Sequence, residues 1–161
     1  MTTVLATDIV IAKLQQSVPD CIDGSSDLDI WIKPDSLRDV CHYLKESEDM
    51  DMRYLVAISA VDYIEYFELV YHLVSMRHNH SLVIKAKCWG REEHTVPSVV
   101  DVWRGADFQE REIYDLMGIS FRDHPNLKRI MLWEGFPGHP QSPLTERLLV
   151  PWAHPHRGGP E

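Results

Sequence analysis

The stretch "YLVAISAVDYIEYFELVYHLVSMRHNHSLVIKAKCW" (Tyr54–Trp89) decides the fold of this chain. It holds three runs rich in β-branched and aromatic residues, separated by "EY" (Glu65–Tyr66) and "HNH" (His78–His80). In the middle run the residues at every second position are Phe67, Leu69, Tyr71, Leu73 and Ser75. A period of two is typical of a strand, and links this short are typical of hairpins, with Asn79 able to adopt a positive φ. The stretch therefore predicts three antiparallel strands.

A helix, a strand and a second helix are predicted before this stretch. Apolar residues recur at helical spacing from Val4 to Leu14, and Val18–Pro19 end the run. "DLDIWIKP" (Asp27–Pro34) alternates as a short half-buried strand does. "SLRDVCHYLKES" (Ser36–Ser47) contains the second helix, whose apolar stripe is Leu37, Val40, Cys41 and Leu44. These elements predict the α+β class: a two-layer domain with helices packed on one face of a small mixed or antiparallel sheet.

A helical region is also predicted after the three strands, from Val99 to Met117, with a bend near Gly105. Asp107 is the expected N-cap of its second half, and Glu110 is then the N3 residue of a capping arrangement. Gly118 stands where a helix needs a residue in the left-handed conformation.

The chain changes character beyond Arg122. Seven of its ten prolines fall between Pro125 and Pro160. Proline removes a backbone donor and breaks both helices and strand ladders, so this part adds little core. The sequence therefore predicts a globular domain over residues 1–121 and an extended, Pro-rich C-terminal arm over residues 122–161 that wraps partner subunits.

Composition excludes several classes of protein. An apolar content of 44% suits a packed core, and a net charge of −9 argues against a nucleic-acid binder, which would carry a basic stripe. No apolar run approaches the roughly 18–20 residues that cross a bilayer, and the N-terminus lacks the pattern of a signal peptide. Three cysteines without a C-x-x-C pair cannot form a four-thiolate zinc or iron–sulfur site. We expect a cytosol-facing domain with no direct membrane span.

A metal site is one reading of the histidines and acids. His78-Asn79-His80 and His154-Pro155-His156 have H-x-H spacing, and several acids lie near His124. Glu110 and Glu112 are two residues apart, roughly 200° around a helix, so they cannot chelate one ion together. No H-E-x-x-H, G-x-S-x-G or phosphate-binding glycine loop occurs. We expect solvated loop histidines, no metal site and no catalytic residues; the alternative is a stand-alone metal-dependent enzyme.

A contact surface is the other reading of "DFQEREIYDLMGISFRDHPNLKRIM" (Asp107–Met131). Ile113, Leu116 and Met117 form the apolar face of its helix, and Arg111 and Asp115 are spaced to form an ion pair. Apolar residues that follow in the Pro-rich arm would be exposed unless they lie on another chain. The segment therefore predicts a partner interface.

The motif in this segment resembles that of a known family. Its parts are Glu110-Arg111-Glu112-x-Tyr114-Asp115-x-x-Gly118, His124-Pro125, Arg129-Ile130 and Gly138-His139-Pro140. Together with Phe67–Phe108 in register, they resemble the thirty-kilodalton subunit family of NADH:quinone oxidoreductase (respiratory Complex I, NDH-1). The chain departs from the usual family pattern around "WEGFPGHP" and after Pro140.

The resemblance implies a non-catalytic subunit in the peripheral arm of a proton-translocating complex, on the cytoplasmic side of the inner (plasma or thylakoid-type) membrane. Such a subunit binds no cofactor: its partners carry FMN and the iron–sulfur clusters, and a neighbouring subunit binds quinone. It stabilises the quinone-reducing module by packing against the hydrogenase-large-subunit-like subunit and adjacent iron–sulfur subunits. The motif residues would then serve the interface. Equivalent subunits of a ferredoxin-fed photosynthetic complex or a membrane-bound hydrogenase are the alternatives.

Overall fold

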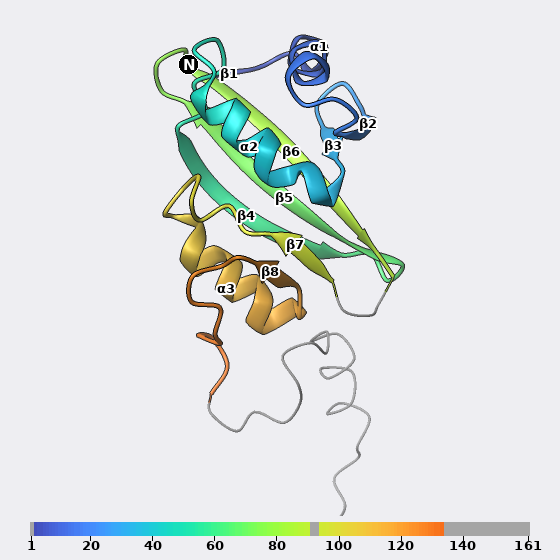
Figure 1. Cartoon of the computed structure of the whole chain (residues 1–161), viewed down its shortest axis with the longest axis vertical. Helices are drawn as coiled ribbons and strands as arrows, with labels where there is room; N and C mark the ends of the chain where they lie inside the picture. Colours follow the sequence, from blue (N-terminus) through green and yellow to red (C-terminus); the bar gives the residue numbers. More distant parts are fainter. Residues whose placement is uncertain (1, 91–93, 134–161) are drawn as a thin grey trace, which may run out of the picture.

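The structure, a computed structural model, describes residues 2–90 and 94–133 (Figure 1). Its main sheet has six strands in the order β2-β3-β6-β5-β4, and β1 pairs with β6 as well. β1 and β3 run parallel to β6, whereas the other neighbours are antiparallel, so the sheet is mixed. The strands are β1 (Thr3–Val4), β2 (Ile22–Ser25), β3 (Ile30–Ile32), β4 (Tyr54–Asp62), β5 (Tyr66–Ser75) and β6 (His80–Trp89).

The three predicted antiparallel strands are confirmed as β4, β5 and β6. β5 and β6 pair without interruption from Tyr66↔Trp89 to Ser75↔His80. β4 pairs with β5 with one irregularity between Leu55 and Ala57. Asn79 has a φ of 54° in the second hairpin, as its short polar side chain allows. The first hairpin turns at Tyr63–Glu65 rather than at the predicted Glu65–Tyr66 link, since Tyr66 already belongs to β5. The alternation of the middle run and the chemistry of the second turn therefore carried the information for this part of the fold.

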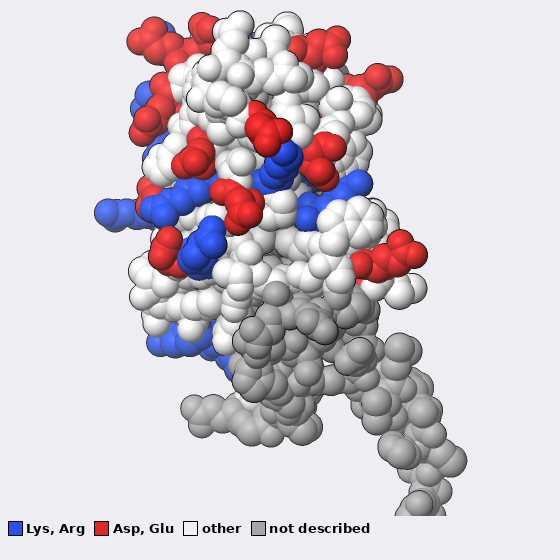
Figure 2. All heavy atoms as spheres, turned by 45° about the vertical axis from the view of Figure 1, so that its right-hand side comes forward, with Lys and Arg blue, Asp and Glu red and all other residues white. Residues whose placement is uncertain are grey.

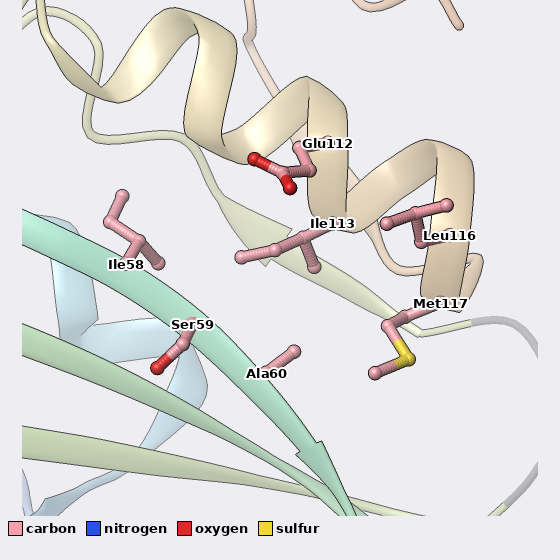
Figure 3. A pocket seen from close by; sticks show the side chains of 7 residues that line it. All are labelled: Ile58, Ser59, Ala60, Glu112, Ile113, Leu116 and Met117. Atoms are coloured by element: carbon pink, nitrogen blue, oxygen red, sulfur yellow. The ribbon is translucent and has the colours of Figure 1, made fainter. Parts of the chain in front are cut away.

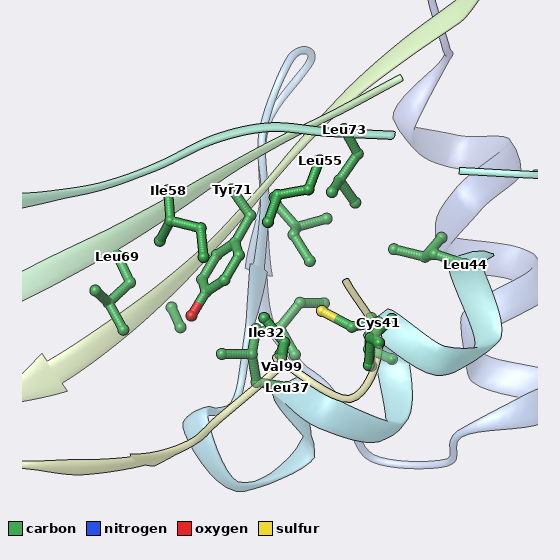
Figure 4. Packing of buried hydrophobic residues seen from close by; sticks show 14 of the residues in the cluster. Ile32, Leu37, Cys41, Leu44, Leu55, Ile58, Leu69, Tyr71, Leu73 and Val99 are labelled. Carbon is green, nitrogen blue, oxygen red and sulfur yellow. The ribbon is translucent and has the colours of Figure 1, made fainter. Parts of the chain in front are cut away.

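The helices cover one face of the sheet and enclose a single core. They are α1 (Thr7–Ser17), α2 (Leu37–Glu46) and α3 (Ala106–Met117), and a 3₁₀ turn, η1 (Pro34–Ser36), leads into α2. The predicted stripe of α2 is fully buried, and Cys41 and Leu44 point toward Tyr71 and Leu73 of β5 (Figure 4). The α+β class, with helices on a mixed sheet, is confirmed.

On the face of the sheet opposite the helices, the side chains around Trp31 pack on one another. The Trp31 indole N–H donates to Glu68 Oε2 at 2.8 Å, and Lys85 Nζ donates to Asp29 at 2.9 Å. Lys85 and Lys87 place their ammonium groups 5.4 and 4.9 Å from the Trp31 ring. Glu68 is only 3% exposed as a result. The indole hydrogen bond and the nearby ammonium group compensate for burying this carboxylate.

Three predicted elements have different bounds. The first helix begins at Thr7 rather than Val4, because Thr3–Val4 pair with His80–Ser81 of β6. The early strand is limited to Ile30–Ile32, and Leu28 is exposed. Residues 100–102 and 104–105 form turns, so the helix expected from Val99 starts only at Ala106.

The prediction of Asp107 as N-cap is wrong. Gly105 occupies that position and makes no side-chain cap, and Asp107 lies inside the first turn of α3. The start of the helix follows a tertiary contact instead: the Trp103 indole N–H donates to the Met52 carbonyl. The Trp103 carbonyl then accepts the Ala106 N–H at the first residue of the helix.

A small second sheet places α3 beside the edge of the main sheet. β7 (Thr95–Pro97) and β8 (Ser120–Arg122) are parallel, and they bracket α3 in the sequence. The Gln109 side chain of α3 accepts the backbone N–H of Ile58 in the edge strand β4. The predicted apolar face of α3 is confirmed, since Ile113, Leu116 and Met117 line a groove of about 220 Å³ against β4 (Figure 3).

The surface carries charges of both signs. On the face in Figure 2, acidic and basic side chains lie interleaved across the middle, and neither sign forms an extended patch. Within the described residues, no helix is both long and apolar enough to span a membrane. The domain division at 121/122 stays a prediction, and the arm from residue 134 onward lies outside the described residues.

Candidate partner interface

The predicted site is built around a segment that returns along α3. We call residues 123–133, which follow β8, the return segment. In Figure 1 it is the orange coil beside α3. Asp115 of α3 anchors it: Oδ2 accepts the backbone N–H groups of Ile130, Met131 and Leu132 at 3.0, 2.7 and 2.9 Å. Arg129 Nε donates to the other oxygen, Oδ1, at 2.8 Å.

This cage fixes the charge state of Asp115. The carboxylate side chain has no exposed surface, and burial alone would raise its pKa. The N–H groups of the return segment and the Arg129 guanidinium outweigh burial, so the pKa of Asp115 lies below its usual value. Three consecutive N–H groups can converge on one oxygen only when the segment adopts one conformation. Asp115 therefore fixes the shape of the return segment.

Arg111 makes a second attachment to the same segment. Its Nε donates to the Lys128 carbonyl at 3.2 Å, and its Nη1 lies 3.7 Å from Asp107 Oδ1. The prediction of an ion pair between Arg111 and Asp115 is wrong. Asp115 binds the return segment and Arg129, whereas Arg111 binds Lys128 and lies near Asp107. Arg111 is only 6% exposed. The two charged residues thus bind the segment at separate points.

Glu110 faces the interior rather than the start of its own helix. It is fully buried; Oε2 accepts the Ser98 hydroxyl at 2.6 Å, and Oε1 accepts the Val99 N–H at 2.7 Å. Burial raises the pKa of Glu110 to about 7, against the lowering effect of these two hydrogen bonds. The carboxyl group ties α3 to the turn after β7. It does not form the capping arrangement that was predicted.

His124 completes the buried network between α3 and the return segment. Its Nδ1 accepts the Asn126 N–H at 3.0 Å, which leaves Nε2 as the donor to the Asp107 carbonyl at 3.2 Å. The same nitrogen lies 3.9 Å from Glu110 Oε2, and both side chains have no exposed surface. His124 thereby holds the first residues of the return segment against α3.

Gly118 ends α3 as predicted, with a φ of 76°. A Cβ is unfavourable in this left-handed conformation. We expect Gly118→Ala to lower the free energy of unfolding by about 1 kcal/mol. Urea denaturation measures this loss, and Gly105→Ala is the matched control, since nothing lies within 4 Å of a Cβ added there and its φ is −66°. Equal stabilities for the two variants would contradict the proposed role of Gly118.

The remaining motif residues are spread between core and surface. Tyr114 and Ile130 are half-buried, while Glu112 and Pro125 are exposed. Glu112 contributes to the groove between α3 and β4. Gly138, His139 and Pro140 lie outside the described residues. The structure therefore brings together Glu110, Arg111, Asp115, His124 and Arg129 by way of the return segment.

Sequence reasoning missed the groups that receive these side chains. Ser98 and Val99 carried no signal as partners of Glu110. The partners of Asp115 and Arg111 are mostly backbone groups, which every residue has. The exposed apolar residues were anticipated in part: Met131 and Trp133 of the return segment are 56% and 65% exposed, and Phe108 of α3 is 65% exposed. These three residues are the outward-facing apolar side chains of the site.

The histidines considered as metal ligands do not gather other ligands in the described part. The rings of His78 and His80 stack with centroids 5.9 Å apart, and His78 Nε2 bonds with the Glu48 carbonyl at 2.8 Å. Within residues 2–90 and 94–133, no group of three or more His, Cys, Asp or Glu side chains could hold a metal ion. His154 and His156 lie outside the described residues.

Comparison with known proteins gives relatives over most of the chain. The family described as "Respiratory-chain NADH dehydrogenase, 30 Kd subunit" matches residues 30–146. A subunit of the NADH-quinone oxidoreductase of Roseiflexus castenholzii is 37% identical over 138 residues, covering 81% of this chain and 79% of that protein. The corresponding NADH-quinone oxidoreductase subunit of Chelativorans sp. is 40% identical over 139 residues, covering 83% and 68%.

A solved structure shares the fold. A chain of the membrane-bound sulfane sulfur reductase, an archaeal respiratory membrane complex, aligns with a TM-score of 0.67 and covers 96% of both chains. Its sequence identity is 18%, so this likeness concerns the fold alone. The family match and the relatives carry the assignment: the chain belongs to the family of the 30 Kd subunit of respiratory-chain NADH dehydrogenase.

Proposed function

We propose that this chain is the thirty-kilodalton-family subunit of a proton-translocating NADH:quinone oxidoreductase of the Complex I type, and that it acts in the peripheral arm without catalysing a reaction itself. Family membership supports a place in a multisubunit respiratory complex. The chain assembles and stabilises the quinone-reducing module against the hydrogenase-large-subunit-like subunit. Flavin, iron–sulfur clusters and quinone belong to neighbouring chains in this proposal.

The observation that carries the proposal is how the motif uses its charged groups. Glu110, Arg111 and Asp115 are all buried, and each is occupied by groups of this same chain. Side chains that are bound within the chain cannot bind a partner directly. Their role is to hold the return segment in one conformation on α3, which sets the shape of the surface. The motif thereby prepares a surface, and Phe108, Met131 and Trp133 are its apolar contacts.

A partner subunit fits the chemistry of this surface. Exposed aromatic and methionine side chains are enriched where proteins meet, and a preformed segment loses less conformational entropy on binding than a flexible one. We place the quinone-site subunit here, with adjacent iron–sulfur subunits beside it. This chain would then join the membrane complex peripherally, on its cytoplasmic side, through other chains. The relatives from Roseiflexus and Chelativorans are subunits of NADH-quinone oxidoreductases, so a hydrogenase-linked or ferredoxin-fed complex is not favoured.

Affinity purification of a tagged chain tests this function. We expect the other subunits of an NADH:quinone oxidoreductase to co-purify with the wild-type chain. Phe108→Ser should weaken the association by about 2 kcal/mol, roughly thirtyfold in affinity, as is typical when a central aromatic contact is lost. The matched control is Leu28→Ser, since Leu28 is also 65% exposed and lies before β3.

Recovery of the wild-type chain without redox subunits would contradict the proposed function. Equal recovery of the complex with Phe108→Ser and with Leu28→Ser would contradict the placement of the interface.

A further inference from the structure

The tip of the first hairpin carries an unusual residue. In the described part of the chain, five residues other than glycine have a positive φ: Asp20, Asp51, Ile64, Asn79 and Asp123. Four of these five are Asp or Asn, whose short polar side chains tolerate this conformation. Ile64, with a φ of 71°, is the exception. A β-branched side chain is among the least suited to left-handed backbone, so the choice of isoleucine needs a reason other than folding.

The local hydrogen bonds define the conformation of Ile64. The Glu65 N–H donates to the Tyr63 carbonyl at 2.8 Å across a central residue with positive φ, which is the rarer and strained form of the γ-turn. The Ile64 N–H donates to Asp62 Oδ1 at 2.8 Å, and the Tyr63 N–H donates to the Tyr66 carbonyl at 3.0 Å. Glycine or asparagine would close the same hairpin with less strain.

The strained turn presents Ile64 to solvent. Ile64 is 77% exposed, more than any other large apolar residue in the described part. Next to it in the chain, the ring centroids of Tyr63 and Tyr66 stack 5.0 Å apart, and those of Tyr66 and Trp89 lie 4.7 Å apart. Tyr63 and Trp89 are themselves 48% and 63% exposed. An exposed aliphatic side chain beside a cluster of aromatic rings suits an anchor that enters a partner's pocket.

The charge of Glu65 indicates which kind of partner fits the hairpin tip. Glu65, next to Ile64, is exposed and carries a negative charge. An exposed carboxylate beside the apolar tip favours a basic side chain opposite it, and it disfavours an anionic lipid surface.

We propose that the hairpin tip, Asp62–Tyr66 with Trp89, is a second docking surface of this chain. Ile64 enters an apolar pocket on a neighbouring protein subunit, and Lys or Arg at the border of that pocket pairs with Glu65. This inference rests on the proposed function, since it requires assembly into the complex. It concerns a surface separate from the α3 motif.

Photo-crosslinking in the assembled complex tests the contact. A benzophenone amino acid at position 64 of the tagged chain is irradiated in the purified complex, and the crosslinked peptide is identified by mass spectrometry. We expect a crosslink to another subunit, at an apolar site with Lys or Arg beside it. A crosslink to a second copy of this chain, or none to protein, would overturn the proposal.

Ile64→Asn separates docking from folding. Because asparagine relieves the strain, the isolated variant should melt at the wild-type temperature or about 2–4 °C above it. Its association with the complex should weaken at least tenfold, as typically follows loss of an apolar anchor. A residue that served folding would show the opposite signs. A lower melting temperature with unchanged association would therefore overturn the proposal.

Met76→Asn is the matched control. Met76 is 73% exposed and lies in the second hairpin turn, after β5, so the same change should leave association unaltered. The failure of this inference differs from the failure of the proposed function. If the wild-type chain fails to co-purify with redox subunits, the function is wrong. If the wild type co-purifies and Ile64→Asn does so equally well, only the docking surface is wrong.

Discussion

Replacing Asp115 by alanine is expected to lower the free energy of unfolding by about 3–5 kcal/mol. The change removes a carboxylate that accepts three backbone N–H groups and the Arg129 guanidinium, and it leaves those donors without their acceptor. We also expect the return segment to separate from α3. Urea denaturation measures the stability, and limited proteolysis after Lys128 or Arg129 reports the release of the segment.

Two variants make this expectation specific. Glu112→Ala removes an acid from an exposed position of the same helix and should change the stability by less than about 0.5 kcal/mol. Asp115→Asn keeps one acceptor oxygen but turns its NH₂ group toward Arg129 or the backbone N–H groups. Its free energy of unfolding should therefore lie between those of the wild type and Asp115→Ala. If Asp115→Ala were as stable as Glu112→Ala, the anchoring role of Asp115 would be refuted.

The Asp115 effect should also depend on pH. Its pKa is lowered in the folded state, so the unfolded chain takes up this proton first as the pH falls. The stabilisation is therefore complete above the ordinary aspartate pKa and is lost as the pH falls through the folded-state value. The stability difference between wild type and Asp115→Ala should shrink in acid over this range.

Glu110 should show the opposite pH dependence. Its pKa rises from 4.5 to about 7 on folding, so between these values the folded chain holds a proton that the unfolded chain has released. Stability from this group is present below pH 4.5 and is lost as the pH rises toward 7. Position 110 does not titrate in Glu110→Gln. Relative to this variant, the free energy of unfolding of the wild type should fall by on the order of 3 kcal/mol between pH 4.5 and 7.5.

The comparison of glutamine with alanine at position 110 tests the hydrogen bonds. Glutamine can accept the Val99 N–H and donate to the Ser98 hydroxyl, whereas alanine leaves both groups buried without Glu110 and creates a cavity. We expect the free energy of unfolding of Glu110→Ala to be about 3 kcal/mol lower than that of Glu110→Gln at neutral pH. Urea denaturation from pH 4.5 to 8 measures both effects. Parallel pH profiles for wild type and Glu110→Gln would rule out the buried proton.

Local patterns predicted the elements that local chemistry determines. The runs of Tyr54–Trp89 are rich in β-branched and aromatic residues and are joined by short turns, and the stripe of α2 repeats at helical spacing, so both could be located from the sequence. β1 could not, because Thr3–Val4 is too short to show a period and exists only through its pairing with β6. The start of α3 could not be located either, because Trp103 and Met52 set it from different parts of the chain.

The candidate site divides in a similar way. The motif located the helix, its glycine terminator and the residues that gather on the return segment. It did not reveal which groups meet. The i, i+4 spacing of Arg111 and Asp115 allows an ion pair within the helix, but in the folded chain both side chains bind the return segment instead. Asp115 binds N–H groups of the backbone, and these leave no mark in the identity of residues 130–132. Ile64 was missed because an isoleucine in a hairpin gives no hint of its φ.

The parallel pairing of β3 with β6 has a consequence for synthesis on the ribosome. Ile30 pairs with Ile84, so β3 cannot pair with β6 until about fifty more residues have been translated. α1 is made before β3 and α2 is made in that interval, and their apolar sides have no sheet to cover until β5 and β6 have emerged. Nascent chains that stop before β6 would therefore depend on chaperones, and productive folding would begin only once the second hairpin has left the exit tunnel.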